Sequence, residues 1–159
     1  MSQVLRSILV GCSLALPAPA LAAEKVQSPD RPYTQGSVWR ISYVQTKPGH
    51  FEDYLNDIAK VFERFQEAQI AKGRVLSYKV LRLADARDNE PNLLLMVEFP
   101  NFAMLDTPDS VWDEARKELF GTMTKEHGAA IDREALRALR GEVLAQELKV
   151  PVQNLPPKK

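Results

Sequence analysis

The chain is poor in cysteine, in excess charge and in long apolar runs. Cys12 is the single cysteine of the 159 residues, so a mature form beginning after Ala22 would have none. Disulfides, thiol catalysis and cysteine-ligated metals are then excluded. The 21 basic side chains match the 21 acidic ones, and without a basic excess we expect no nucleic-acid partner. No apolar run approaches the roughly 20 residues of a transmembrane helix, so no transmembrane segment is expected.

Several catalytic signatures are missing as well. The sequence contains no glycine-rich phosphate loop, no HExxH pair and no serine elbow, which argues against nucleotide-dependent, zinc-peptidase and lipase activities. We therefore expect no metal site and no cofactor. A cofactor-independent oxygenase needs only a shaped pocket with a few polar groups, so the sequence leaves enzymatic activity open.

Residues 1–22 have the layout of a secretory signal peptide. Arg6 is followed by an apolar stretch from Ile8 to Leu16, and Ala20-Leu21-Ala22 offers the small residues needed for cleavage. We expect a periplasmic or secreted protein. The alternative is that Leu9-Val10-Gly11-Cys12 is a lipobox that leaves a lipidated Cys12, but the apolar stretch after Arg6 would then be too short.

Apolar periodicity predicts one domain over residues 38–150, after a flexible lead-in at 23–37 and before a disordered tail at 151–159. Alternation in the first strand sends Trp39, Ile41 and Tyr43 to one face. The segment from Ala129 to Val150 is ambiguous. Residues 131–139 suit a helix, and the return segment after Gly141 is read as a strand, with continuation of that helix as the alternative. The predicted elements are a strand at 38–46, a helix at 50–71, an antiparallel hairpin of 74–83 with 92–99, a helix from about 108 to 126 that stops at Gly128, and a strand at 141–150.

Three motifs carry a resemblance to a known family. W-x-I-x-Y at 39–43, K-P-G-x-F-x-x-Y-L at 47–55 and G-x-V-x-S-Y-x-V at 73–80 resemble the dimeric α/β-barrel group, which includes antibiotic-biosynthesis-type monooxygenases and NIPSNAP-like proteins. The resemblance implies an α+β, ferredoxin-like β-α-β-β-α-β fold with an antiparallel sheet. It also implies a homodimer formed through the open face of the sheet, and a ligand pocket between the sheet and its own helices.

Aromatic side chains are the main candidates for such a pocket. They are expected between sheet and helices, either as core residues or as walls of a ligand site. His127 is read as a helix C-cap or as a haem ligand or proton shuttle, and Arg40 as a partner of Glu98 or an anchor for an anion. Haem-degrading members of the group combine an Asn, a Trp and a His, and the first strand here has no Asn. The candidate ligand-binding residues are Trp39, Tyr43, Tyr54, Tyr78, Trp112 and His127.

The sequence thus predicts an exported homodimer that binds a small apolar or aromatic molecule between sheet and helices. A cofactor-free or haem-dependent monooxygenase is the first alternative. A structural or partner-binding periplasmic module is the second.

Overall fold

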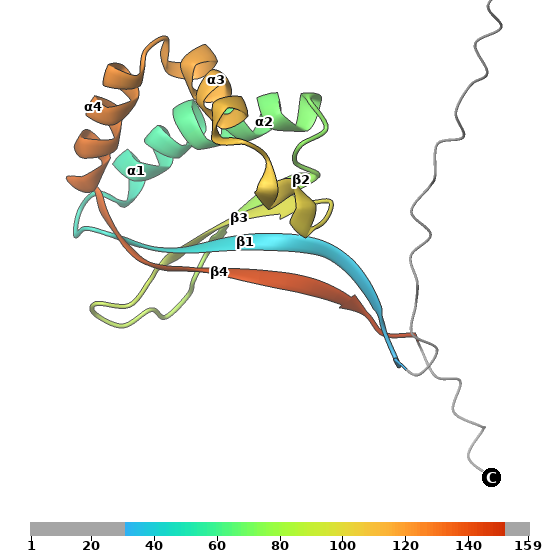
Figure 1. Cartoon of the computed structure of the whole chain (residues 1–159). Helices are drawn as coiled ribbons and strands as arrows, with labels where there is room; N and C mark the ends of the chain where they lie inside the picture. Colours follow the sequence, from blue (N-terminus) through green and yellow to red (C-terminus); the bar gives the residue numbers. More distant parts are fainter. Residues whose placement is uncertain (1–30, 152–159) are drawn as a thin grey trace, which may run out of the picture. The chain divides into compact units, whose positions relative to one another are not determined.

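The computed structural model describes residues 31–151 (Figure 1). The predicted signal peptide, the lipobox alternative at Cys12, residues 23–30 of the lead-in and residues 152–159 lie outside the described residues. Among the helices of the described part, none is both long and apolar enough to cross a membrane.

The chain has a ferredoxin-like α+β fold built on a four-stranded antiparallel sheet, as the sequence predicts. The spatial order of the strands is β2-β3-β1-β4, so β1 and β2 both pair with β3 and the first crossover is a split β-α-β unit. The strands are β1 (Thr34–Thr46), β2 (Ser77–Arg82), β3 (Leu93–Phe99) and β4 (Arg137–Lys149).

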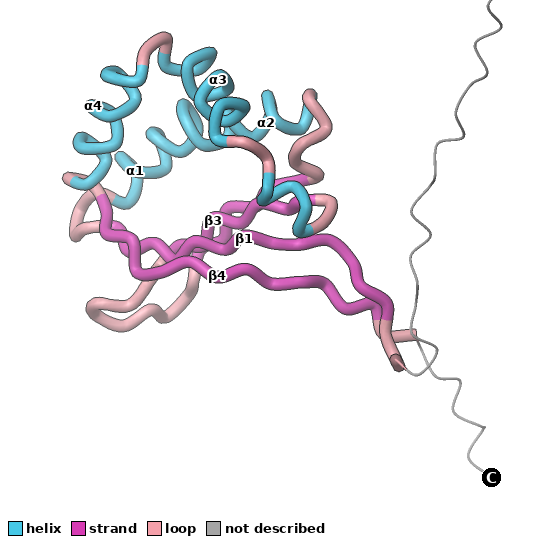
Figure 2. The backbone as a smooth tube through the Cα atoms, in the orientation of Figure 1, coloured by secondary structure: helices cyan, strands magenta, loops and turns pink. Residues whose placement is uncertain are grey.

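Helices cover one face of this sheet (Figure 2). Side chains on β3 alternate strictly between buried and half-buried, because successive residues of a strand point to opposite faces. The helix-facing set packs in two clusters, one under Tyr54 and Ile58, which are 2% and 3% exposed, and one beside Val75 and Trp112. This set consists of Leu93, Leu95, Val97 and Phe99 on β3 with Val38, Arg40, Ser42 and Val44 opposite them on β1.

The first crossover is one continuous helical rod with an irregular middle. It comprises α1 (Phe51–Ile58), a π-helical segment (Ala59–Glu63) and α2 (Arg64–Ala71), and it ends at Gly73 with a φ of 69°. Its length agrees with the predicted helix. The π-helical segment was not predicted, and it lies directly over the sheet.

The second crossover differs from its prediction. A 3-10 turn (Phe102–Asp106) leads to α3 (Asp109–Phe120), which ends at Gly121 with a φ of 80°. A new helix, α4 (Met123–Glu134), begins at the Thr122 cap, whose hydroxyl accepts a hydrogen bond from the Lys125 amide at 3.2 Å. The predicted stop at Gly128 is therefore wrong, because the chain turns at Gly121 and Gly128 lies inside α4.

The first and last strands of the chain begin earlier than predicted. β1 starts at Thr34, so residues 34–37 are not part of a flexible lead-in. The segment after Gly141 is a strand, as predicted, but β4 already starts at Arg137. Gly141, with a φ of 147°, lies where the β1–β4 register shifts between Tyr43 and Val44. Such an irregularity suits glycine.

Candidate functional site

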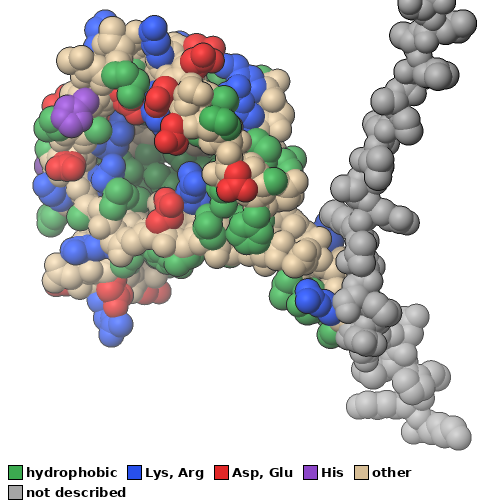
Figure 3. Space-filling model, viewed as in Figure 1, with side chains coloured by type: hydrophobic (Ala, Val, Ile, Leu, Met, Phe, Trp, Pro, Cys, Tyr) green, Lys and Arg blue, Asp and Glu red, His purple; other side chains and the backbone are tan. Residues whose placement is uncertain are grey.

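A cavity of about 360 Å³ lies between the helix-facing side of the sheet and the helices. Figure 3 shows it as a hollow in this face of the molecule, with apolar side chains inside and Lys or Arg side chains at its rim. Its volume falls at the lower end of the range for small-molecule sites. The apolar walls include Ile58, Phe62, Phe65, Leu95, Leu119 and Phe120.

Positive side chains outnumber negative ones around this cavity. Four arginines and only two carboxylates line it, and they come from β1, α1, α3, α4 and β4. The charged lining residues are Arg40, Arg116, Arg133, Arg137, Asp57 and Glu126.

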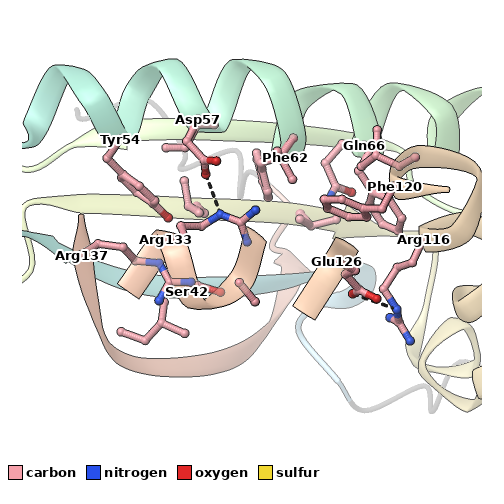
Figure 4. A pocket seen from close by; sticks show the side chains of 18 of the residues that line it. Ser42, Tyr54, Asp57, Phe62, Gln66, Arg116, Phe120, Glu126, Arg133 and Arg137 are labelled. Carbon is pink, nitrogen blue, oxygen red and sulfur yellow. Dashed lines mark hydrogen bonds and ion pairs between the residues drawn. The ribbon is translucent and has the colours of Figure 1, made fainter. Parts of the chain in front are cut away.

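Two ion pairs connect helices across the cavity (Figure 4). Arg133 Nε on α4 lies 2.6 Å from Asp57 Oδ2 on α1, and both side chains are largely buried. Arg116 Nε on α3 lies 3.3 Å from Glu126 Oε1 on α4. These pairs hold α4 against its neighbours while the space beneath stays open.

Arg40 does not pair with Glu98, so that prediction is wrong. The register puts Glu98 opposite Trp39, on the other face of the sheet. Arg40 Nε instead forms an ion pair at 3.4 Å from Glu142 Oε1, and this nitrogen makes no hydrogen bond within the described residues. Glu142 accepts a hydrogen bond from the Ser42 hydroxyl at 2.9 Å.

Arg133 and Arg137 each present a buried nitrogen that has no hydrogen-bond partner among the described residues. These atoms are Nη2 of Arg133 and Nε of Arg137. The Arg137 guanidinium carbon lies 5.9 Å from the centre of the Tyr54 ring, and Figure 4 shows the Tyr54 hydroxyl directed toward the two arginines. Burial raises the pKa of Tyr54, against the opposing effect of the Arg137 cation, so this hydroxyl is a neutral donor at pH 7.

Of the predicted aromatic residues, Tyr54 alone lines the cavity. Tyr78 faces the helices but stands beside it, with its ring edge-on to Phe62 at a centroid distance of 5.8 Å. The Tyr78 hydroxyl donates to Glu67 Oε1 at 2.9 Å. Trp112 lines a neighbouring hollow of about 290 Å³, which shares Arg40, Phe65, Gln66, Val97 and Arg116 with the cavity.

Trp39 and Tyr43 do not lie between sheet and helices, so their predicted position is wrong. They pair with Glu98 and Leu94 on β3, and these four side chains share the face that no helix within residues 31–151 covers. His127 is exposed within α4, away from the helix end that it was expected to cap. The structure therefore does not bring Tyr43, Trp112 and His127 together.

The residues that give the cavity its polar character were missed by the sequence reasoning. Arg133 and Arg137 fall in the stretch where helix and strand were hard to separate, and Arg116 was hidden on a helix judged by its apolar face. Gln66 is 8% exposed and lines the cavity. Its position four residues after Phe62 places it beside the apolar stripe of the helix, and this spacing was the signal in the sequence.

Comparison with known proteins finds a similar solved structure but no matching family or curated sequence. A scan against protein-family models found no match, and neither did a search of curated protein sequences. The crystal structure of a dimeric ferredoxin-like protein from an uncultured marine organism is similar to this chain, with a TM-score of 0.43 and 8% sequence identity over 79% of this chain and 95% of that one. At this similarity the fold assignment rests on the chain's own topology. The resemblance to monooxygenases and NIPSNAP-like proteins stays a prediction.

Proposed function

We propose that the protein binds a small apolar or aromatic molecule in the cavity between sheet and helices. The observation that carries this proposal is the cavity itself: about 360 Å³ of space under a helical layer, walled mainly by aromatic and aliphatic side chains. Protein interiors are normally close-packed, and voids larger than a water molecule are few. A space of this size with convergent polar groups at one end is typical of a ligand site.

A neutral fluorescent probe tests this function. N-phenyl-1-naphthylamine should bind with one site per chain and gain fluorescence. The variant Ala130→Phe places a ring in the cavity, which Ala130 lines, and should weaken binding at least about tenfold, since a filled site loses its apolar contacts. The matched control is Ala135→Phe, because Ala135 is exposed at the end of the same helix. Unchanged binding by a folded Ala130→Phe protein would contradict the proposal.

We further propose that the protein is a homodimer formed through the open face of the sheet. This face carries apolar side chains on all four strands, and Leu81 and Val143 on it are 43% and 44% exposed. An antiparallel sheet with two apolar faces needs a cover on both, and isologous pairs are the commonest assemblies. The face also carries one cation, Lys79, and one anion, Glu98, so its charges can pair with those of the same face on a second copy of the chain. The apolar residues of the face are Trp39, Ile41, Tyr43, Leu81, Leu94, Met96, Val143 and Ala145.

Sedimentation velocity at micromolar concentration tests the dimer. The unmodified protein should sediment as a dimer, and Ile41→Asp should sediment as a monomer because it buries a charge in the centre of the proposed interface. Leu76→Glu is the control, since Leu76 is 51% exposed and lies before β2 outside this face. A wild-type monomer would contradict the proposal.

Export and the absence of a cofactor belong to the same proposal. Mass spectrometry of the protein recovered from the periplasm of an expressing bacterium should give a chain starting at Ala23, whereas a lipid on Cys12 would support the lipobox. Haem added to the purified protein should leave the free-haem absorbance spectrum unchanged. A shifted Soret band would instead favour the haem-dependent alternative.

A further inference from the structure

We infer that the ligand carries a carboxylate, which Arg137 and Arg133 bind beside the Tyr54 hydroxyl. This inference rests on the proposed function, because the arginines line the same cavity. It specifies the chemical class of the ligand and its orientation in the cavity, with the acid group at the Tyr54 end.

The charge at this end of the cavity favours an anion. Arg133 is paired with Asp57, which offsets one positive charge. Arg137 makes no ion pair among the described residues. About one positive charge is thus left uncompensated, which matches a singly charged carboxylate better than a doubly charged phosphate.

Hydrogen bonding points to the same atoms. A buried N–H group without an acceptor is unfavourable, and more so when the group is charged. Arg133 Nη2 and Arg137 Nε are both in this state within the described part of the chain. A carboxylate has two oxygens that accept hydrogen bonds from guanidinium groups in a planar arrangement, and the neutral Tyr54 hydroxyl is a third donor at the same end (Figure 4).

The rest of the cavity fits an apolar body. Beyond the arginine end, Figure 4 shows Phe62 and then Phe120 and Gln66 along the same space. Apart from Gln66, the walls there are mainly rings and aliphatic chains. The neighbouring Arg116 is already paired with Asp113 and Glu126, and Arg40 with Glu142. The expected ligand is therefore a small aromatic or branched aliphatic monocarboxylic acid.

Three matched probes test this inference by isothermal titration calorimetry: naphthalene-2-carboxylate, its neutral amide 2-naphthamide, and 2-naphthyl phosphate. The carboxylate should bind at least about tenfold more tightly than the amide, because hydrogen bonds to charged groups are the stronger ones. This preference should persist from pH 6 to pH 9, since arginine stays protonated throughout. Phosphate binding equal to or tighter than carboxylate binding would overturn the assignment.

Arg137→Gln should remove the preference, weakening carboxylate binding about 10- to 100-fold while amide binding changes less than about threefold. Arg140→Gln is the control, because it removes the same charge from the same strand at an exposed position outside the cavity. Retained amide binding shows that the variant is folded. If the amide and the carboxylate bind wild type equally, the inference fails and the proposed function stands. If neither the probes nor N-phenyl-1-naphthylamine bind, both fail.

Discussion

Replacing Arg137 with methionine should stabilise the ligand-free protein, although it removes a charged side chain. Methionine keeps an apolar stem against Tyr54 and eliminates the buried Nε–H group that has no acceptor among the described residues. An unsatisfied buried donor costs about 1–3 kcal/mol. The lost cation–π contact, at 5.9 Å from the ring centre, is worth about 0.5–1 kcal/mol. With the middle of each range, the difference is a gain of about 1 kcal/mol in the free energy of unfolding.

Urea unfolding followed by far-UV circular dichroism measures this gain as a higher midpoint at an unchanged slope. Arg133→Met is the informative comparison, because it leaves Asp57 largely buried without its partner and should lose about 1–3 kcal/mol. A loss of more than about 1 kcal/mol for Arg137→Met would refute the reasoning, since Arg137 would then have a stabilising partner in the free protein. A stabilised variant that binds carboxylates poorly would show the stability–function trade-off expected of a binding site.

Three further predictions concern the effects of single substitutions on the stability of the protein. Phe62→Ala should cost only about 2 kcal/mol in urea unfolding, below the 3–5 kcal/mol of a close-packed phenylalanine, because one side of the ring borders the cavity. The control is Leu93→Ala, which should cost about 3–4 kcal/mol because Leu93 is 1% exposed. Equal losses for the two variants would argue against an open cavity. Burial alone would raise the pKa of Glu98, but the hydroxyls of Ser37 and Ser77 and the cations of Lys79 and Lys149 outweigh it and lower the pKa. The stability that Glu98 contributes is therefore complete above about pH 4.5 and is lost as the pH falls through its folded-state pKa. Urea midpoints measured from pH 7 to pH 3 should fall less steeply with pH in Glu98→Gln than in the unmodified protein. The same dependence on pH in both proteins would contradict this. Gly121→Ala should lower the thermal midpoint, because a φ of 80° is strained for a residue with a Cβ and costs about 1–2 kcal/mol. No atom lies within 4 Å of the added Cβ, so no clash adds to this cost. An unchanged midpoint would show that the turn relaxes.

The sequence was sufficient to locate all four strands, because alternation marks β1 and an apolar run bounded by turn residues marks β3. The resemblance to a known fold supplied the order of the elements. The sequence was not sufficient to decide which face the helices cover. β3 is apolar on both sides, with Leu93, Leu95 and Val97 on one and Leu94 and Met96 on the other. Trp39 and Tyr43 were therefore assigned to the wrong side, since aromatic character alone does not distinguish a core from an interface.

The cavity was harder to predict than the fold, because it depends on where the second crossover breaks. A helix running on to Gly128 would not bring Arg133 over the sheet beside Asp57. The break at Gly121 and the Thr122 cap redirect α4, so that its last turn delivers Arg133 and the first residue of β4 delivers Arg137. The local signal was present, a glycine followed at once by a capping threonine, but the second glycine at position 128 competed with it.

The π-helical segment Ala59–Glu63 has a consequence for the identity of the residues that reach the cavity. A π turn takes up about one residue more than an α turn, so the helix after it is out of phase by about 100° with the helix before it. In an unbroken α-helix, the stripe through Ile58 and Phe62 would continue to Phe65 and Gln69. The wider winding also turns Gln66 inward, where it is 8% exposed and lines the cavity. Deleting one residue that does not line the cavity, such as the exposed Lys60, would thus let the rod continue as a regular α-helix with Gln66 still directed inward. Rewinding the intact segment as an α-helix would instead rotate every later side chain by about 100°.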